Sequence, residues 1–97
     1  MTLTYLATIP VKPEHMEEAC KAVAAIASTT RDEAGCIAFE PRRAADGSST
    51  ITIFEEWADG DAFDFHHAQE YTKDVFAKYE SWLESDPVLI EVKPLES

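Results

Sequence analysis

The sequence has few basic residues, and this scarcity excludes several kinds of partner. Lys and Arg number 8 against 19 Asp and Glu, which gives a formal net charge of −11. Such a charge repels nucleic-acid phosphates and anionic lipid headgroups over the range that salt screening allows. We therefore expect neither nucleic acid nor a membrane surface as a partner.

Cysteines and long apolar runs are also scarce. The two cysteines, Cys20 and Cys36, have neither a CxxC spacing nor the density of a secreted disulfide scaffold, so we expect buried or free thiols. The longest purely apolar run, residues 22–27, is far shorter than the ~20 residues of a membrane span. The amino terminus lacks a basic segment followed by an apolar one. These features predict a cytoplasmic protein.

Several familiar site motifs are missing. The chain has no GxGxxG, no P-loop, no GxSxG and no HExxH. His66 and His67 are adjacent, so on a helix they point about 100° apart and cannot chelate one ion together. His15 stands alone. We therefore expect no metal site.

What the chain does have is the size and composition of one small domain. It contains 97 residues, of which 45% are hydrophobic, and we expect a single domain over residues 1–97. A domain this small buries a modest fraction of its surface, so burial against a second copy would help it. A homodimer is therefore expected.

Hydrophobic periodicity predicts four strands and two helical regions. Strands are expected over residues 2–11, 36–43, 51–57 and 88–93. Helices are expected over residues 13–32 and from about residue 61 to 84, the second one broken near residues 68–71. Asp46-Gly47 predicts a hairpin between the two central strands, because glycine accepts a positive φ.

The order β-α-β-β-α-β predicts an α+β, ferredoxin-like fold. In this fold a four-stranded antiparallel sheet carries its helices on one face. The strands place apolar residues on both faces, for example Leu6, Phe54 and Ile90 on one and Ile53 and Leu89 on the other. A second copy of the sheet is the economical cover for the face without helices.

Four segments resemble a known family. They are Ala34-Gly35-Cys36, Phe54-Glu55-Glu56-Trp57, Ala62-Phe63-Asp64-Phe65-His66 and the helix from Tyr71 to Trp82. Together with the order of elements, they resemble the antibiotic biosynthesis monooxygenase family of dimeric α+β barrel proteins, which includes quinol monooxygenases. The resemblance implies a sheet-to-sheet homodimer with a pocket in each subunit between the sheet and the helices.

The resemblance also implies a chemistry. Similar members oxygenate hydroquinones and electron-rich polycyclic phenols with O₂ as co-substrate and without metal, flavin or haem. A deprotonated hydroquinone can itself give an electron to O₂, so the protein needs an apolar slot, a base and protection from water. We therefore expect a cofactor-independent monooxygenase that acts on a small aromatic or quinol-like substrate.

His66 is the candidate catalytic base, since a histidine titrates near neutral pH. The alternative is a hydrogen-bonded histidine on a partly buried helix, and His67 is expected to point elsewhere, toward solvent or a dimer contact. The substrate-binding candidates are aromatic: Tyr5, Phe54, Trp57, Tyr71, Phe76 and Tyr79. Each of them also has a simpler role as a packing residue.

Two glutamates and two arginines near the hairpin complete the set of polar candidates. Glu55 and Glu56 alternate faces, so one of them is expected to face a covered side and to need a partner. Arg42 and Arg43, across the hairpin, are the expected ion-pair partners.

Other activities stay open. One branch of the family, an isomerase of a phosphorylated signal-derived sugar, resembles the chain in its Phe-His helix. Haem degradation is disfavoured, because members of that branch carry an axial histidine about ten residues after the position of His66, and here that position is Phe76. A non-catalytic dimer that binds a small apolar ligand is the alternative from a different class.

Overall fold

The order of elements follows the predicted periodicity closely. The computed structural model describes residues 2–96, so the outermost two residues of the domain expected over 1–97, Met1 and Ser97, lie outside it. The elements are β1 (Leu3–Pro10), a single 3-10 turn η1 (Pro13–His15), α1 (Met16–Arg31), β2 (Cys36–Arg43), β3 (Thr50–Trp57), α2 (Gly60–Ala68), α3 (Glu70–Trp82) and β4 (Val88–Val92).

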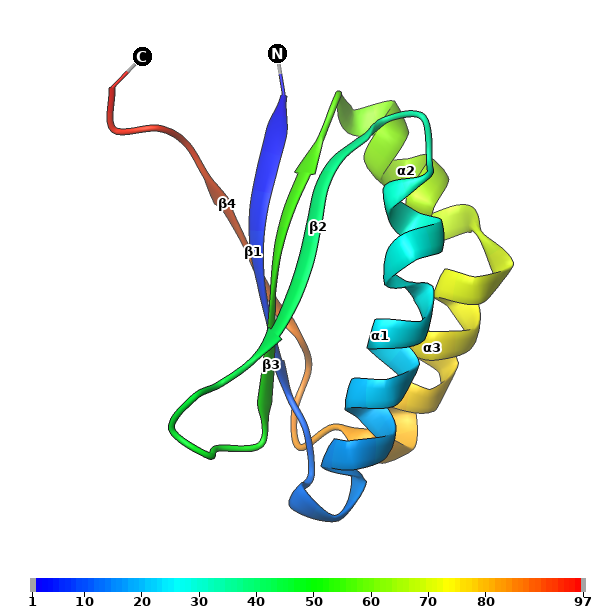
Figure 1. The fold of residues 1–97 in the computed structure, drawn as a ribbon, viewed down its shortest axis with the longest axis vertical. Helices are drawn as coiled ribbons and strands as arrows, with labels where there is room; N and C mark the ends of the chain where they lie inside the picture. The colour runs from blue at the N-terminus through cyan, green and yellow to red at the C-terminus, as the bar shows by residue number, and fades with distance from the viewer. Residues whose placement is uncertain (1, 97) are drawn as a thin grey trace.

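The four strands form one antiparallel sheet in the order β2-β3-β1-β4. All helices lie on the same side of this sheet, with α1 and α3 packed side by side (Figure 1). The order βαββαβ with this strand order is the ferredoxin-like fold, so the predicted fold class is confirmed. One face of the sheet therefore carries the core, and the other carries no helix.

The break between α2 and α3 has a local cause. Asp59 caps α2, because its Oδ1 accepts a hydrogen bond from the backbone N–H of Ala62 at 2.8 Å. Gln69 leaves the helical region with φ −73° and ψ 142°, and α3 starts directly after it. The predicted break near residues 68–71 is confirmed.

The hairpin between β2 and β3 turns where the sequence predicts. Gly47 has φ 85°, a left-handed conformation that a residue with a Cβ adopts only with strain. The backbone N–H of Ser48 is held by the Asp46 carboxylate at 2.9 Å. This turn fixes the register of β2 against β3 and, with it, which side chains of β3 face the helices.

Register divides the strand residues between two different surroundings. Leu6 on β1 lies opposite Phe54 on β3 and Ile90 on β4. All three are exposed, from 38% to 53%, on the face without helices. The next residues, among them Ala7 and Ile53, face the helices and are buried. The expectation of apolar residues on both faces is confirmed.

The core fills the space between the sheet and the helices. On α1 the buried side chains recur at three- and four-residue spacing, as an amphipathic helix requires. The core residues are Ala7, Ile9, Val11, Met16, Ala19, Val23, Ala27, Phe39, Ile51, Ile53, Trp57, Val75 and Tyr79. Trp57 is the largest of the fully buried side chains.

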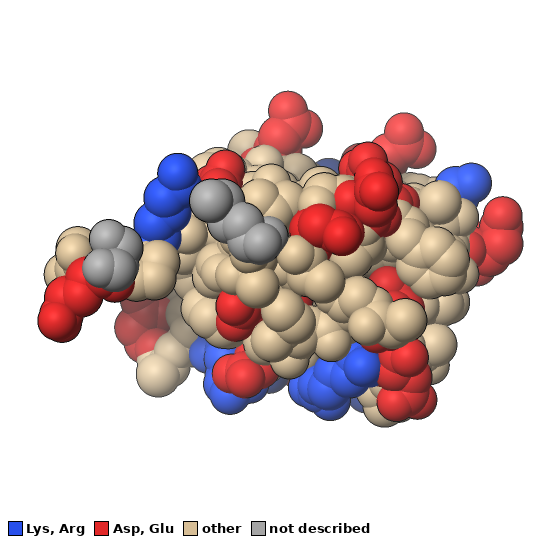
Figure 2. Space-filling model, turned by 90° about the horizontal axis from the view of Figure 1, so that it is seen from above, with Lys and Arg blue, Asp and Glu red and all other residues tan. Residues whose placement is uncertain are grey.

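Most charged residues lie on the surface, and the ion pairs among them differ from the sequence-based expectation. Figure 2 shows acidic side chains spread across one end of the molecule, with the basic ones at its edges. Arg42 and Arg43 pair with Glu40 and Glu17, at 3.3 and 3.1 Å, and not with Glu55 or Glu56. Within residues 2–96 no helix has both the length and the apolar character needed to cross a membrane.

Candidate active site

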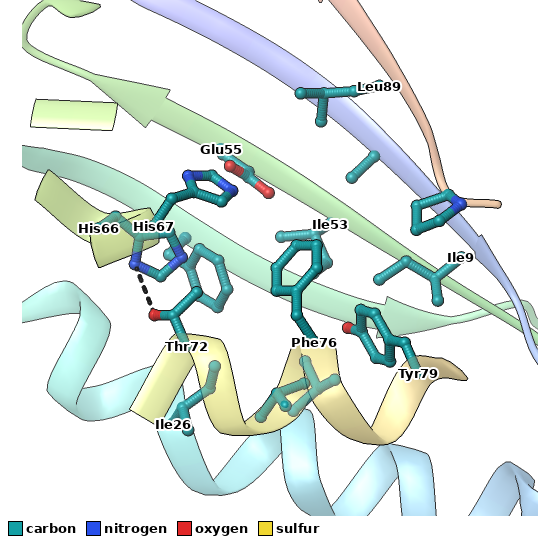
Figure 3. A pocket seen from close by; sticks show the side chains of 15 residues that line it. Ile9, Ile26, Ile53, Glu55, His66, His67, Thr72, Phe76, Tyr79 and Leu89 are labelled. Atoms are coloured by element: carbon teal, nitrogen blue, oxygen red, sulfur yellow. Dashed lines mark hydrogen bonds between the residues drawn. The ribbon is translucent and has the colours of Figure 1, made fainter. Parts of the chain in front are cut away.

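A cavity of about 290 Å³ opens between the sheet and α3. Its walls are mostly apolar, and five polar side chains interrupt them (Figure 3). The apolar walls come from Ala7, Ile9, Val23, Ile26, Phe39, Ile53, Val75, Phe76, Pro87 and Leu89, and the polar groups are Glu55, His66, His67, Thr72 and Tyr79. Few polar groups in an apolar hollow is the usual make-up of a small-molecule site.

His66 lies toward one end of this cavity (Figure 3) and is 3% exposed. Its ring stacks on the indole of Trp57, with centroids 4.8 Å apart, and lies 5.6 Å from the ring of Phe39. Burial lowers the pKa of the imidazole, and the neighbouring Glu33 partly offsets that effect. The ring is therefore neutral at physiological pH and able to accept a proton.

Glu33, in the turn between α1 and β2, forms a hydrogen bond with the ring of His66. Its Oε2 lies 3.0 Å from His66 Nδ1 and also accepts a hydrogen bond from the hydroxyl of Tyr71. The side chain of Glu33 is only 5% exposed. Burial and this bond to Glu33 raise the pKa of the Tyr71 phenol, which stays protonated and acts as a donor.

His67 also lines the cavity, so the expectation that it points elsewhere is wrong. Its Nδ1 lies 3.0 Å from the backbone carbonyl oxygen of Phe63, which can only accept. Nδ1 therefore carries a proton, and in the neutral ring Nε2 is an acceptor. The ring is wedged between the side chains of Phe63 and Phe76, with centroids at 4.3 and 5.6 Å.

Glu55 brings a carboxyl group to the same end of the cavity. It is 6% exposed, and its Oε1 accepts a hydrogen bond from Trp57 Nε1 at 3.0 Å. Burial raises the pKa of this carboxyl, whereas the bond from Trp57 and the nearby His67 lower it by smaller amounts. Figure 3 places Glu55 beside the two histidines. The expectation that one of the paired glutamates faces a covered side is confirmed, but its partner is an indole.

Tyr79 and Phe76 come from α3 and form the wall toward the cavity mouth. Tyr79 is 7% exposed, and burial raises the pKa of its phenol, so the group stays a donor. Phe76 packs against it, with ring centroids 5.2 Å apart, and is 45% exposed. Phe76 therefore lies where a ligand would enter.

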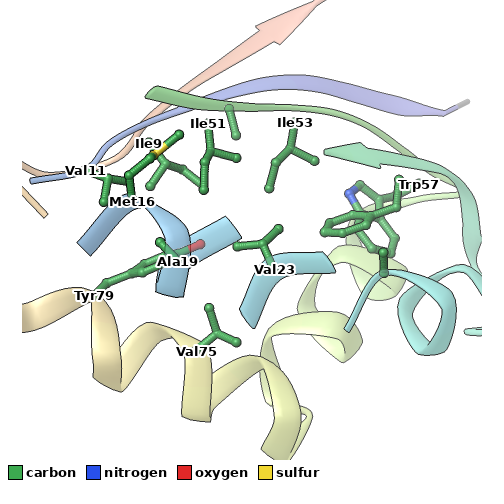
Figure 4. Close-up of a cluster of buried hydrophobic side chains, with 13 residues drawn as sticks. Ile9, Val11, Met16, Ala19, Val23, Ile51, Ile53, Trp57, Val75 and Tyr79 are labelled. Atoms are coloured by element: carbon green, nitrogen blue, oxygen red, sulfur yellow. The ribbon is translucent and has the colours of Figure 1, made fainter. Parts of the chain in front are cut away.

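Four of the predicted binding residues do not line this cavity. Trp57 is fully buried in the core (Figure 4), and its indole stacks on the ring of His66. Tyr5 packs against Phe63, and Tyr71 is engaged with Glu33. Phe54 lies on the opposite face of the sheet. Of the predicted set, the structure brings His66, Phe76 and Tyr79 together.

Glu33, Thr72 and His67 are site residues that sequence reasoning did not single out as such. Glu33 directly precedes the Ala34-Gly35-Cys36 motif, but nothing in its local pattern distinguishes it from the chain's many surface acids. Its contact with His66 joins residues 33 positions apart. For His67, the sequence signal was its position next to His66. Because α2 ends at Ala68, both histidines lie in the last turn of this helix.

The donor groups of the described residues are not arranged as a metal site. Residues 2–96 contain no group of three or more His, Cys, Asp or Glu side chains placed to hold an ion. The polar groups of the cavity instead suit proton transfer: a neutral imidazole backed by a carboxylate, a second imidazole, and a carboxyl with a raised pKa.

Comparison with known proteins agrees with this architecture. The chain is similar over its full length to the protein Rv0793 from Mycobacterium tuberculosis, with 21% identity, 98% of that chain covered and a TM-score of 0.90. It is also similar to PA3566 from Pseudomonas aeruginosa, with 26% identity, 97% and 94% of the two chains covered and a TM-score of 0.89.

A further structure, of SO0527 from Shewanella oneidensis, shares 27% identity over 94% of this chain and 90% of its own, with a TM-score of 0.84. No curated protein sequence matches the chain. The family profile described as antibiotic biosynthesis monooxygenase matches residues 2–78, which includes Glu33, Glu55 and both cavity histidines. The chain therefore belongs to the antibiotic biosynthesis monooxygenase family.

Proposed function

We propose that this protein is a cofactor-independent monooxygenase that oxidises a hydroquinone or polycyclic phenol with O₂, with His66 as the base. The observation that carries the proposal is a largely apolar cavity lined by a buried histidine whose Nδ1 contacts a carboxylate, that of Glu33. Membership of the antibiotic biosynthesis monooxygenase family supports the same class of reaction.

The size of the cavity favours the smaller members of this substrate class. About 290 Å³ lies at the lower end of the roughly 300–1,000 Å³ typical of ligand sites. One- and two-ring hydroquinones are therefore the preferred candidates over larger fused systems. Aromatic walls such as Phe39 and Phe76 suit a flat ring, and Tyr79 offers a donor to one of its oxygens.

The reaction begins with a proton transfer. Nε2 of His66 takes the proton of a quinol hydroxyl: the O–H bond breaks and an N–H bond forms. The quinolate then gives one electron to O₂, and the resulting superoxide joins the ring carbon through a new C–O bond, which yields a peroxide anion that takes the proton from His66 and becomes a hydroperoxide. The apolar walls keep water from these charged species.

The remaining steps balance atoms and electrons. The carbon that bears the hydroperoxide loses its hydrogen as a proton, a C=O bond forms there as the O–O bond breaks, and the outer oxygen leaves as hydroxide, which combines with that proton to give water. Naphthohydroquinone plus O₂ thus gives hydroxynaphthoquinone plus water. The substrate supplies all four electrons that reduce O₂, so the scheme requires no external reductant.

Oxygen consumption by the purified protein tests this proposal. Naphthohydroquinone, smaller hydroquinones and anthrone are supplied in chelator-treated buffer, and the enzyme-free autoxidation rate is subtracted. We expect one O₂ per quinol, with one atom of labelled O₂ in the product. His66→Ala lowers kcat by about 10²–10⁴-fold, the usual contribution of a general base. His15→Ala, which removes a histidine remote from the cavity, serves as the matched control.

The alternatives predict different outcomes in the same assay. Plain quinone together with hydrogen peroxide would mean a two-electron oxidase and would contradict oxygen insertion. Saturable binding of the quinol without oxygen consumption would select a non-catalytic binding protein. Turnover of a sugar-like substrate that continues without O₂ would select the isomerase activity.

We also propose that two copies of the chain pair through the open face of the sheet. Leu6, Phe54 and Ile90 form a continuous row across β3, β1 and β4, because they are direct partners in the register. They are 44%, 38% and 53% exposed in the single chain. A row of this kind favours burial against a second sheet over exposure to water.

A further inference from the structure

A buried carboxylate beside His66 has no assigned role in the reaction steps proposed above. The side chain of Glu33 is 5% exposed, yet the basic side chain that contacts it within residues 2–96 is the imidazole of His66, and no lysine or arginine pairs with it. Its Oε1 is buried without a hydrogen-bond partner among the described residues. Burying a carboxylate this incompletely satisfied costs stability, so its retention calls for a reason beyond packing.

The hydrogen-bond pattern fixes which nitrogen of His66 carries the proton. A carboxylate oxygen can only accept, so Nδ1 of His66, 3.0 Å from Oε2 of Glu33, is the donor. In the neutral ring Nε2 then carries no proton and is an acceptor. Figure 3 shows that second nitrogen on the side of the ring that faces the cavity.

Side chains from two elements restrain the ring of His66. Trp57 stacks on it with an interplanar angle of 29°, and Oγ1 of Thr72 lies 3.5 Å from Nδ1. Tyr71 donates to the same oxygen of Glu33 and so holds the carboxylate in place. The contact between Glu33 and His66 is therefore braced from β3 and α3 together.

The turn that carries Glu33 meets α2 at unusually close range. A Cβ built on Gly35 would lie 2.3 Å from Cβ of Ala62, and the carbonyl of Gly35 accepts a hydrogen bond from the N–H of Ala58 at 2.8 Å. Only a residue without a side chain permits this approach. The close approach brings residue 33 within reach of the helix that carries His66.

We propose that Glu33 is the positioning residue of His66: it sets the Nδ1–H tautomer, aims Nε2 into the cavity and stabilises the imidazolium that forms when the quinol gives up its proton. This inference rests on the proposed function. Glu33 accepts no proton and touches no substrate. Glu33 would act as the carboxylate of a catalytic triad does, by orienting a histidine. Here the carboxylate comes from a turn and the histidine from a helix.

The charges around His66 give the role a pH signature. The ionisable groups that face this corner are Glu33 and Arg31 from the end of α1 and the turn after it, Cys36 from β2, Glu55 from β3, His67 from α2 and Tyr71 from α3. Among these, Glu33 is the group that raises the pKa of His66. Removing its charge lowers that pKa further, so the acid limb of activity moves to lower pH.

Histidine-selective nitrogen NMR on the full-length protein tests the geometry without any substrate. In the wild type we expect His66 to give the signals of an Nδ1–H tautomer, whereas free imidazole side chains prefer Nε2–H. In Glu33→Gln we expect a mixture of tautomers and a lower His66 pKa. An Nε2–H tautomer in the wild type would overturn the proposal. This part of the test uses the wild-type protein alone, so it does not depend on whether a variant folds.

Oxygen uptake with naphthohydroquinone supplies the second readout. In Glu33→Gln we expect kcat to fall at least about tenfold, part of the about 10²–10⁴-fold that a general base contributes, with KM little changed. The acid limb of its profile lies at lower pH than in the wild type. If the maximal kcat falls but the acid limb of the pH–activity profile stays at the wild-type pH, Glu33 has only a structural role and the proposal is overturned.

Two further variants sharpen the comparison. Glu18→Gln removes an acid from an exposed histidine, His15, at a similar distance of 3.2 Å, and should leave both the His66 signals and kcat unchanged. Glu33→Asp keeps the charge and should restore part of the activity lost in Glu33→Gln. Absence of oxygen uptake in the wild type overturns the proposed function, whereas the wild-type tautomer tests Glu33 independently.

Discussion

The indole N–H of Trp57 donates to the carboxyl of Glu55 over 3.0 Å, between two residues on the helix-facing side of the same strand. The bond ties the largest buried side chain of the core to a polar group of the cavity. It explains how β3 can carry a glutamate inward without a basic partner, because a buried carboxyl is tolerated when a donor meets it. The core and the candidate site thus share one strand.

Glu55 should make stability depend on pH. Its folded-state pKa is raised, so between its unfolded and folded pKa values the folded protein binds more protons, and stability falls as the pH rises through that window. Glu55→Gln keeps an acceptor for Trp57 and removes the titration. We expect the variant to lose less stability than the wild type between about pH 4 and pH 7, as measured by urea denaturation.

Glu56→Gln is the matched control, since it changes the neighbouring glutamate on the other face of the strand. It should show the pH slope of the wild type. An equal slope in wild type and Glu55→Gln would contradict the assignment of this pH dependence to Glu55.

Gly35→Ala should destabilise the protein by about 1–3 kcal/mol, the usual cost of overpacking. The new Cβ would lie 2.3 Å from that of Ala62, so the turn and α2 must separate. Denaturation with urea measures the loss, and Ala62→Gly in the same chain should recover much of it. Gly60→Ala is the control: nothing lies within 4 Å of its added Cβ, and it should be neutral or slightly stabilising. Wild-type stability in Gly35→Ala would refute the close approach.

Phe76→Ala should change the preferred size of the substrate. Phe76 lines the cavity and is 45% exposed, so truncating it widens the site without opening the core. We expect kcat/KM for three-ring anthrone, relative to two-ring naphthohydroquinone, to rise by about tenfold, a typical value for the removal of a steric block in an apolar pocket. Phe65→Ala removes an exposed phenylalanine from α2 outside the cavity and should leave the ratio unchanged.

Phe54→Glu should disrupt the proposed dimer. Phe54 lies directly opposite Leu6 in the centre of the open face, where a charge would have to be buried against a second copy. Light scattering at micromolar concentration should report a dimer for the wild type and a monomer for the variant. Phe65→Glu, an equal change on α2, should stay dimeric. A wild-type monomer would remove the basis for a shared sheet.

The fold could be predicted from the sequence because the signals for strands, helices and turns are local. Alternation identified the strands to within one or two residues, three- and four-residue spacing identified α1 and α3, and Asp46-Gly47 placed the hairpin. The first helix was predicted from residue 13, and its first turn is the separate 3-10 turn η1. Each of these features depends on residues a few positions apart, so the pattern is visible in the sequence itself.

The site was only partly accessible to the same reasoning. The nomination of His66 drew on its neutral-range pKa and on the family resemblance, and the structure adds a buried, braced ring. Trp57 was expected as a cavity wall or a core anchor, and it lies in the core beneath that ring. Which aromatic side chains reach the cavity depends on how α2 and α3 are tilted after Gln69, and no local pattern encodes that tilt.

The sequence by itself determined the elements, their order and the two apolar faces of the sheet, because backbone propensity and periodicity act over a few residues. Only the tertiary structure decided which groups meet. Glu33 and His66 are 33 residues apart, and their contact exists because Gly35 lets a turn approach α2 closely. Burial then lowers the pKa of His66, the group whose neutral form the proposed reaction needs.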